Sequence, residues 1–245
     1  MKADLSNYSW ALDHILKLNL EKHIKVVAEV GSRDAMDAIY LQKRLSCDVF
    51  VFEPDPFNSI ICQENILNYE FNSHLYFNQL ALSNENGLID FYSIDKTKYE
   101  NVGSSGMYQI NFRRRPRLDP DKNRDSVQNR VRVNASRFDS LKIPTPDLLA
   151  MDVEGSEIKV LKGFGVLIKQ VQFIVLETSF WNNFQNHRDV STFPKISRYL
   201  EKNNFQFIAS NHEGNLHFPK RSKRRTVLYQ HQPNFDVLYC NKDLL

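Results

Sequence analysis

Short apolar runs alternate with segments of helical spacing along the first third of the chain. Residues 25–30 and 48–52 are compact runs rich in valine and phenylalanine, typical of buried strands, and residues 75–82 predict a third strand. Between these runs, residues 35–45 and 58–68 carry apolar side chains at helical spacing. This order of strand, helix and strand predicts an α/β fold with a parallel sheet and right-handed crossovers.

The same order returns after a less regular middle. Residues 88–94 predict a strand, and the polar, proline-containing segment 113–132 predicts a loop. We expect one domain over residues 25–245, with a basic insertion at about residues 111–132 and a helical N-terminal extension over residues 1–24. The remaining expected elements are strands at 148–151, 173–176, 205–209 and 235–240, and helices at 8–20, 156–161 and 193–202.

The composition suits a single α/β domain with additions. The chain has 245 residues, 42% of them hydrophobic and 25% charged, and a net charge of +3. Its cysteines, Cys47, Cys62 and Cys240, are scattered, which argues against a structural zinc site and a disulfide framework. No apolar run approaches the roughly 18 residues that span a bilayer, and the first residues lack the order of a signal peptide. The pattern therefore predicts a cytoplasmic protein without a membrane span.

One stretch, residues 148–163, carries the strongest chemical signal. A buried strand ends in Asp152, and Glu154 follows before Gly155 turns the chain into a helix. Open α/β sheets bind ligands at the carboxyl ends of their strands, so we expect both acids at the mouth of a site. There, Asp152 and Glu154 can orient or deprotonate a hydroxyl. The alternative for Glu154 is to cap the following helix, whose N-terminus favours negative charge.

The exits of the first two strands indicate an adenosine-type ligand. Gly31 lets the backbone approach a ligand, and Glu53, followed by Pro54, can accept hydrogen bonds from both hydroxyls of a ribose. About twenty residues separate the two, as one strand–helix–strand unit requires. Ser32 and Ala35 stand where a dinucleotide fingerprint would need further glycines. The pattern therefore disfavours a pyrophosphate cradle, and with it a dehydrogenase.

Taken in order, these motifs resemble the FkbM family of S-adenosylmethionine-dependent methyltransferases. The resemblance covers roughly residues 26–241. It departs from the family pattern at Ala35, where a second glycine is frequent. Besides Gly31, Glu53 and residues 152–155, the matching pieces are Phe52-Glu-Pro-Asp-Pro56, Asn65, Ala81-Leu-Ser83, Gly103-Ser-Ser105, Phe138-Asp-Ser-Leu141, Leu161-Lys-Gly163 and Asn234-Phe-Asp-Val-Leu238.

The resemblance implies a Rossmann-like class I methyltransferase sheet of seven strands, mostly parallel, with helices on both faces and the last strand antiparallel. It also implies an enzyme that moves a methyl group from S-adenosylmethionine to a hydroxyl of a sugar, glycan or related small-molecule acceptor. The residues that we expect to contact the cofactor are Glu29, Gly31, Ser32, Glu53, Pro54, Gln79, Ala81, Leu82 and Asp152. Those that we expect to contact the acceptor are Ser104, Ser105, Arg113, Arg114, Arg115 and Glu177.

Three further side chains, Glu177, His187 and His212, end or follow the later strands and are candidates for the site. Glu177 ends the strand after the one that ends in Asp152, so the two carboxylates can face each other and hold a magnesium or calcium ion. The favoured alternative has no required metal, with Glu177 hydrogen-bonded to a loop or in contact with the acceptor. His187 and His212 are candidate general bases. His212 is the stronger candidate because it directly follows a strand.

Two basic clusters, within residues 113–132 and 220–225, keep a second class of acceptor open. Such clusters bind nucleic acid, recruit an anionic acceptor such as a phosphorylated glycan, or are simply solvated loops. The alternatives are therefore a nucleic-acid methyltransferase acting on ribose or a cap, and a catalytically silent binding module on the same fold. The turn at residues 152–155 is not the Asn/Asp-Pro-Pro-aromatic turn of enzymes that methylate base amino groups.

Overall fold

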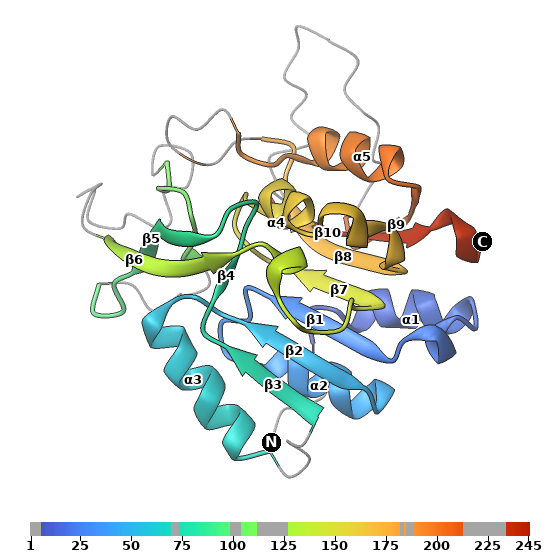
Figure 1. The fold of residues 1–245 in the computed structure, drawn as a ribbon, viewed down its shortest axis with the longest axis horizontal. Coiled ribbons are helices and arrows are strands. Elements are labelled where there is room, and N and C mark those ends of the chain that lie inside the picture. The colour runs from blue at the N-terminus through green and yellow to red at the C-terminus, as the bar shows by residue number, and fades with distance from the viewer. Residues whose placement is uncertain are drawn as a thin grey trace, which may run out of the picture.

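A seven-stranded sheet forms the centre of the protein (Figure 1). The computed structural model describes residues 6–69, 74–98, 104–111, 127–181, 184, 189–212 and 234–245. The strand order is β3-β2-β1-β7-β8-β10-β9, and β10 runs antiparallel to both of its neighbours. The predicted α/β class and the antiparallel last strand are therefore confirmed. The strands are β1 (Val26–Val30), β2 (Asp48–Phe52), β3 (Leu75–Asn78), β7 (Leu148–Met151), β8 (Phe173–Thr178), β9 (Phe205–Ser210) and β10 (Phe235–Asn241).

Helices cover both faces of this sheet because its strands are apolar on both sides. Successive side chains of a strand point to opposite faces. Val27 accordingly packs with helices α1, α2 and α3, whereas Ala28 packs with α4 and α5. The result is a three-layer arrangement with two separate hydrophobic clusters. The helices are α1 (Ser9–Lys17), α2 (Met36–Leu45), α3 (Pro56–Leu67), α4 (Glu157–Gly163) and α5 (Phe193–Lys202).

The N-terminal helix belongs to the same core as the sheet. Tyr8, Ala11 and Ile15 are buried in the cluster that also contains Val27 and Ala38. Residues 6–24, expected as an extension, therefore pack against the sheet, and they bring Tyr8 to the carboxyl ends of its strands. Among the described residues, no helix is long and apolar enough to cross a membrane.

A second, three-stranded sheet lies beyond the carboxyl ends of the parallel strands (Figure 1). It consists of β4 (Ala81–Leu82), β5 (Gly87–Ile94) and β6 (Gln128–Ser136) in the order β4-β6-β5. The single strand predicted over residues 75–82 is thus wrong. The chain leaves the large sheet after Asn78, and β4 pairs with β6 instead.

Strand β6 also corrects the loop predicted over residues 113–132. The last part of that predicted loop, from Gln128, belongs to β6, which pairs with β5 along eight residues in register. Val131 and Val133 alternate with Arg130 and Arg132, so one face is apolar and the other is charged. Because the arginines make the segment strongly polar, its sequence predicts a loop and does not reveal this alternation. The rest of the basic segment, residues 112–126, lies outside the described residues.

Candidate active site

The loop after β1 lies directly against the loop after β7. Gly31 has a φ of +81°, and a Cβ placed on it would lie 1.9 Å from the backbone oxygen of Asp152. Only glycine adopts this conformation without strain and leaves room for that oxygen. This close approach is the physical reason for a single glycine at the end of β1, and it joins the two loops into one wall.

Glu29 and Ser32 support this loop from inside the protein. Both are buried, and the Ser32 hydroxyl donates a hydrogen bond of 2.6 Å to the Glu29 carboxylate. The same hydroxyl accepts a hydrogen bond of 3.0 Å from the backbone N–H of Ala35. Burial, followed by the neighbouring charge of Asp37, raises the pKa of Glu29 well above its ordinary value. Glu29 therefore braces the loop, and it does not line either cavity described below.

Glu53 is fixed at the end of β2 by two backbone amides. Its carboxylate accepts hydrogen bonds from the N–H of Arg33 at 2.9 Å and of Asp55 at 2.7 Å. Burial is the largest influence on this carboxyl and raises its pKa to about 7, while the two amide hydrogen bonds act in the opposite direction. The carboxylate is thus held in one orientation, with Pro54 beside it in the same cavity wall.

Two cavities open above these strand ends, and they meet at Gly31, Arg33 and Asp152. The larger one, here called the acidic cavity, has a volume of about 320 Å³. The smaller one, here called the narrow cavity, has a volume of about 40 Å³ and lies over β2, with Glu53 in its wall. Its other lining residues include Pro54, Asn58, Phe91, Ser105, Met107 and Ser156. Gly31, Glu53 and Asp152, which the sequence placed at one ligand, therefore line one space.

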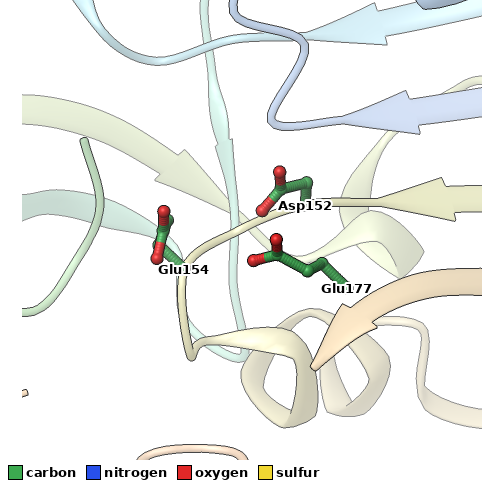
Figure 2. Close-up of side chains that lie close together, drawn as sticks. All are labelled: Asp152, Glu154 and Glu177. Atoms are coloured by element: carbon green, nitrogen blue, oxygen red, sulfur yellow. The ribbon is translucent and has the colours of Figure 1, made fainter. Parts of the chain in front are cut away.

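Three carboxylates converge in the acidic cavity, as Figure 2 shows. Asp152 and Glu177 follow or end the neighbouring strands β7 and β8, and Glu154 lies in the turn after β7 with a φ of +48°. One carboxylate oxygen from each lies within 4.8 Å of the others. Oxygen ligands in this arrangement suit a divalent cation, and they equally suit the positive groups of an organic ligand.

Two hydrogen bonds near the cluster bear on the alternatives predicted for Glu154, a helix cap or a site residue, and for Glu177, a metal ligand or a partner of a loop. The side-chain amide of Asn234 donates a hydrogen bond of 3.0 Å to Glu177. The N–H of Gly155, at the start of the α4 turn, donates to Glu157 at 3.0 Å. Glu154 itself is buried and lines the acidic cavity.

Several predicted site residues lie elsewhere. Ala81 and Leu82 are buried in two different hydrophobic clusters, and Gln79 is exposed. None of these three lines the acidic or the narrow cavity, because the chain turns away from the large sheet after Asn78. His212 packs edge-on against Phe235, with ring centroids 5.0 Å apart, and also lies outside both cavities.

The remaining predicted residues divide into two groups. Ser104 lines the acidic cavity. Ser105 lines the narrow cavity, where its hydroxyl accepts a hydrogen bond from the N–H of Ile94 at 2.9 Å. The others lie outside the described residues, namely Gly103, Arg113, Arg114, Arg115, His187 and the cluster 220–225.

Sequence reasoning missed one side of the acidic cavity. Asn7 and Tyr8, before α1, lie beside Asp37 of α2 and Asp236 of β10 in its wall. Asn7 donates two hydrogen bonds to Asp37, from its backbone N–H at 2.9 Å and from its side chain at 3.1 Å. Burial raises the pKa of Asp236 to about 6. Asp236 falls in the matched segment 234–238, but no local pattern indicates the contact made by Asn7 and Tyr8.

Comparison with known proteins agrees with this fold. The model of the FkbM methyltransferase domain matches residues 25–207, most of the chain. The 2-O-methyltransferase NoeI of Sinorhizobium fredii (strain NBRC 101917 / NGR234) is 30% identical over 175 residues. That match covers 65% of this chain and 65% of NoeI, so slightly less than two thirds of the relative's length.

Two solved structures are similar in fold. A methyltransferase FkbM from Methylobacillus flagellatus KT superposes with a TM-score of 0.51 at 16% identity, over 89% of this chain and 43% of that one. A ribosomal protein L11 methylase from Lactobacillus delbrueckii subsp. bulgaricus gives 0.50 at 10% identity, over 95% and 77%. The fold is therefore that of class I methyltransferases. With its family match over residues 25–207, the chain belongs to the FkbM methyltransferase family.

Proposed function

We propose that the protein transfers a methyl group from S-adenosylmethionine to a hydroxyl oxygen of a sugar or glycan. The observation that carries this proposal is the shared wall of Gly31, Glu53 and Asp152. Glu53, which we assign to the ribose, and Asp152, which we assign to the reaction, lie on either side of Gly31. A side chain at Gly31 would collide with the backbone of Asp152.

The walls of the two cavities fit the parts of this donor. Glu53 accepts the ribose hydroxyls, and Pro54, Asn58, Phe91 and Met107 surround the base in the narrow cavity. The donor carries positive charge on its sulfonium and ammonium groups. The carboxylates of the acidic cavity are complementary to both charges.

The chain's own groups then orient the acceptor and take up its proton. The donor supplies an activated methyl carbon. As the acceptor oxygen bonds to that carbon, the carbon–sulfur bond breaks and its electron pair stays on sulfur. Asp152 orients the hydroxyl and accepts its proton, with Glu154 beside it. Ser104 and Glu177 hold the rest of the acceptor.

The acceptor class is inferred from charge and from a relative. NoeI is by name a 2-O-methyltransferase. The described wall of the acidic cavity contains five carboxylates, of Asp37, Asp152, Glu154, Glu177 and Asp236, so a phosphorylated acceptor would be repelled there. An uncharged, hydroxyl-rich acceptor is therefore favoured over nucleic acid. In the described part of the basic segment, Arg130 and Arg132 are both paired with Asp90.

Two experiments test the proposal. S-adenosylmethionine is expected to raise the melting temperature, whereas NAD is not, and the reverse result would exclude the proposed donor. Incubation with labelled donor and a panel of glycans, lipids and oligonucleotides is expected to label a neutral glycan. Labelling of RNA or DNA alone, with steeply salt-dependent binding, would establish the nucleic-acid alternative instead.

A further inference from the structure

Asn7 and Tyr8, just before α1, form one wall of the acidic cavity. The two hydrogen bonds from Asn7 to Asp37 tie this segment to the first turn of α2. The N–H of Tyr8 donates to the Ser6 hydroxyl at 3.0 Å, which fixes the backbone just before α1. The Tyr8 side chain is 4% exposed, packs in the cluster beneath α1, and lines the cavity. Its phenol is thus held in place.

Most side chains that can donate a hydrogen bond in this cavity already donate one to a carboxylate of the protein. The Arg33 guanidinium donates to Asp34 at 3.0 and 3.2 Å. The side chains of Ser32, Asn7 and Asn234 donate to Glu29, Asp37 and Glu177, respectively. Among the described lining residues, the hydroxyls of Tyr8 and Ser104 have no hydrogen-bond partner within the protein.

The small number of unused donors beside many carboxylates determines which group of a ligand Tyr8 can bind. The cavity has an excess of carboxylates, so a positive group entering it finds many partners. A negative group needs one of the unused donors, which are the hydroxyls of Tyr8 and Ser104 and the remaining N–H groups of Arg33. Burial and the charges of Asp152 and Glu29 raise the pKa of Tyr8 well above its ordinary value. The phenol therefore stays protonated and can donate a hydrogen bond to an anion.

The position of Tyr8 indicates which anion. With its ribose at Glu53 and its methyl group at Asp152, the proposed donor extends its amino-acid end past Gly31 into the acidic cavity. That end carries one ammonium and one carboxylate. Tyr8 lies beside Asp37, next to the loop after β1, whereas Ser104 is close in the chain to Gly106, which contacts Glu154.

We propose that the Tyr8 hydroxyl binds the α-carboxylate of S-adenosylmethionine, while the acids around it bind the ammonium group. The inference rests on the proposed donor. Tyr8 is then a donor-binding residue contributed by a segment that precedes the family match.

Decarboxylated S-adenosylmethionine tests this assignment, because it lacks only the group that Tyr8 would bind. Calorimetric titration of both compounds is compared between the wild type and Tyr8→Phe, which keeps the buried ring. We expect Tyr8→Phe to weaken S-adenosylmethionine about tenfold, as the loss of one charge-assisted hydrogen bond predicts. Binding of the decarboxylated compound is expected to stay within about twofold.

Two control variants test whether the loss of affinity is specific to the Tyr8 hydroxyl. Tyr40→Phe removes a hydroxyl from a half-buried tyrosine packed on the same cluster but outside both cavities, and it is expected to leave both affinities unchanged. Ser104→Ala is expected to leave the ratio of the two affinities unchanged. Melting temperatures verify that each variant is folded.

The outcomes separate this inference from the proposed function. If Tyr8→Phe weakens both compounds equally or neither, or if Ser104→Ala alone changes the ratio, the Tyr8 assignment is wrong and the donor stands. If the wild type binds no S-adenosylmethionine, the proposed donor fails and the Tyr8 assignment fails with it.

Discussion

The Glu53 carboxylate accepts a hydrogen bond of 2.9 Å from the backbone N–H of Arg33, which ties the end of β2 to the loop after β1. Because that loop also lies against the Asp152 carbonyl through Gly31, the ends of β2, β1 and β7 form one continuous surface. A substitution at Gly31, Glu53 or Asp152 is therefore expected to alter the positions of the other two residues.

Replacing Glu53 tests the ribose site. Glu53→Ala removes the acceptor for the ribose hydroxyls and also two hydrogen bonds from backbone amides. We expect affinity for S-adenosylmethionine to fall about 10- to 100-fold, as for the loss of hydrogen bonds to a charged group. Calorimetric titration measures this. Glu64→Ala, on the exposed face of α3, is the control. An unchanged affinity in Glu53→Ala would remove the ribose assignment.

The pKa of Glu53 predicts a pH dependence of opposite sign for stability and for binding. Burial raises this pKa from 4.5 to about 7, so the folded protein retains a proton that the unfolded chain releases. Its contribution to the free energy of unfolding is therefore largest below pH 4.5 and is lost as the pH rises through about 7. Donor affinity is expected to rise over the same interval, because the ionised carboxylate is the better acceptor for ribose hydroxyls.

Glu53→Gln separates this effect from other titrating groups. The buried Glu157 also has a pKa raised to about 7, so the variant is expected to flatten the stability profile only in part. The pH dependence of donor affinity is expected to lose the part that comes from Glu53. The part that comes from Asp236 is expected to remain, because Asp236 lines the acidic cavity and has a pKa of about 6, whereas Glu157 lines neither cavity. Urea unfolding and calorimetry at pH 5, 6, 7 and 8, chosen at roughly unit intervals across the window, measure both. A variant that keeps the wild-type rise in affinity would contradict the assignment.

Adding one methyl group at Gly31 is expected to disrupt the site. In Gly31→Ala the new Cβ would overlap the Asp152 carbonyl, at a φ that only glycine adopts readily. We expect a loss of about 2–4 kcal/mol in the free energy of unfolding together with loss of donor binding. Gly87→Ala is the matched control, because Gly87 also has a positive φ but a Cβ placed on it would meet nothing within 4 Å. That variant is expected to lose about 1 kcal/mol and bind donor normally.

Asp152 is expected to act on turnover more than on donor binding. Asp152→Asn keeps the size of the side chain but removes its ability to accept a proton, which predicts a fall in kcat of about 10²- to 10⁴-fold. Donor affinity is expected to fall much less than turnover. Asp13→Asn, on the exposed side of α1, is the control. Steady-state rates with a glycan acceptor measure the effect, and near-normal turnover in Asp152→Asn would show that another group accepts the proton.

The cluster of Asp152, Glu154 and Glu177 calls for a test of metal dependence. Because Glu177 already accepts a hydrogen bond from Asn234 and the donor brings its own positive charges, we expect activity to persist after dialysis against EDTA. Loss of activity that is restored by Mg²⁺ or Ca²⁺, but not by Na⁺ at equal ionic strength, would instead make the three carboxylates ligands of a required ion.

The core of the site could be predicted from the sequence because it depends on local rules. Gly31 and Glu53 each follow or end an apolar run, and one strand–helix–strand unit brings such positions to the same sheet edge. Asp152 follows from the same reasoning one parallel strand further along. The parallel strands β1, β2, β7 and β8 were likewise recognisable, since buried parallel strands are almost continuous apolar runs.

The other walls depend on contacts between distant segments. The hydrogen bonds between Asn7 and Asp37 join residues 30 positions apart, and neither residue belongs to a pattern of its own. Ala81 and Leu82 were expected at the cofactor because the resemblance to the FkbM family implied it, but β3 ends at Asn78. Their pairing with β6 takes them into hydrophobic clusters instead.

The contact between the N-terminal segment and α2, made by Asn7, has a practical consequence for truncated or chimaeric forms of this protein. Tyr8 and Asp236 both lie outside residues 25–207, at opposite ends of the chain, yet they face the same hollow. A fragment or chimaera bounded by the family match would keep every residue that lines the narrow cavity but would leave the acidic cavity open on two sides. Exchanging only the segments outside the family match between relatives would, conversely, change the lining of the acidic cavity and leave that of the narrow cavity unchanged.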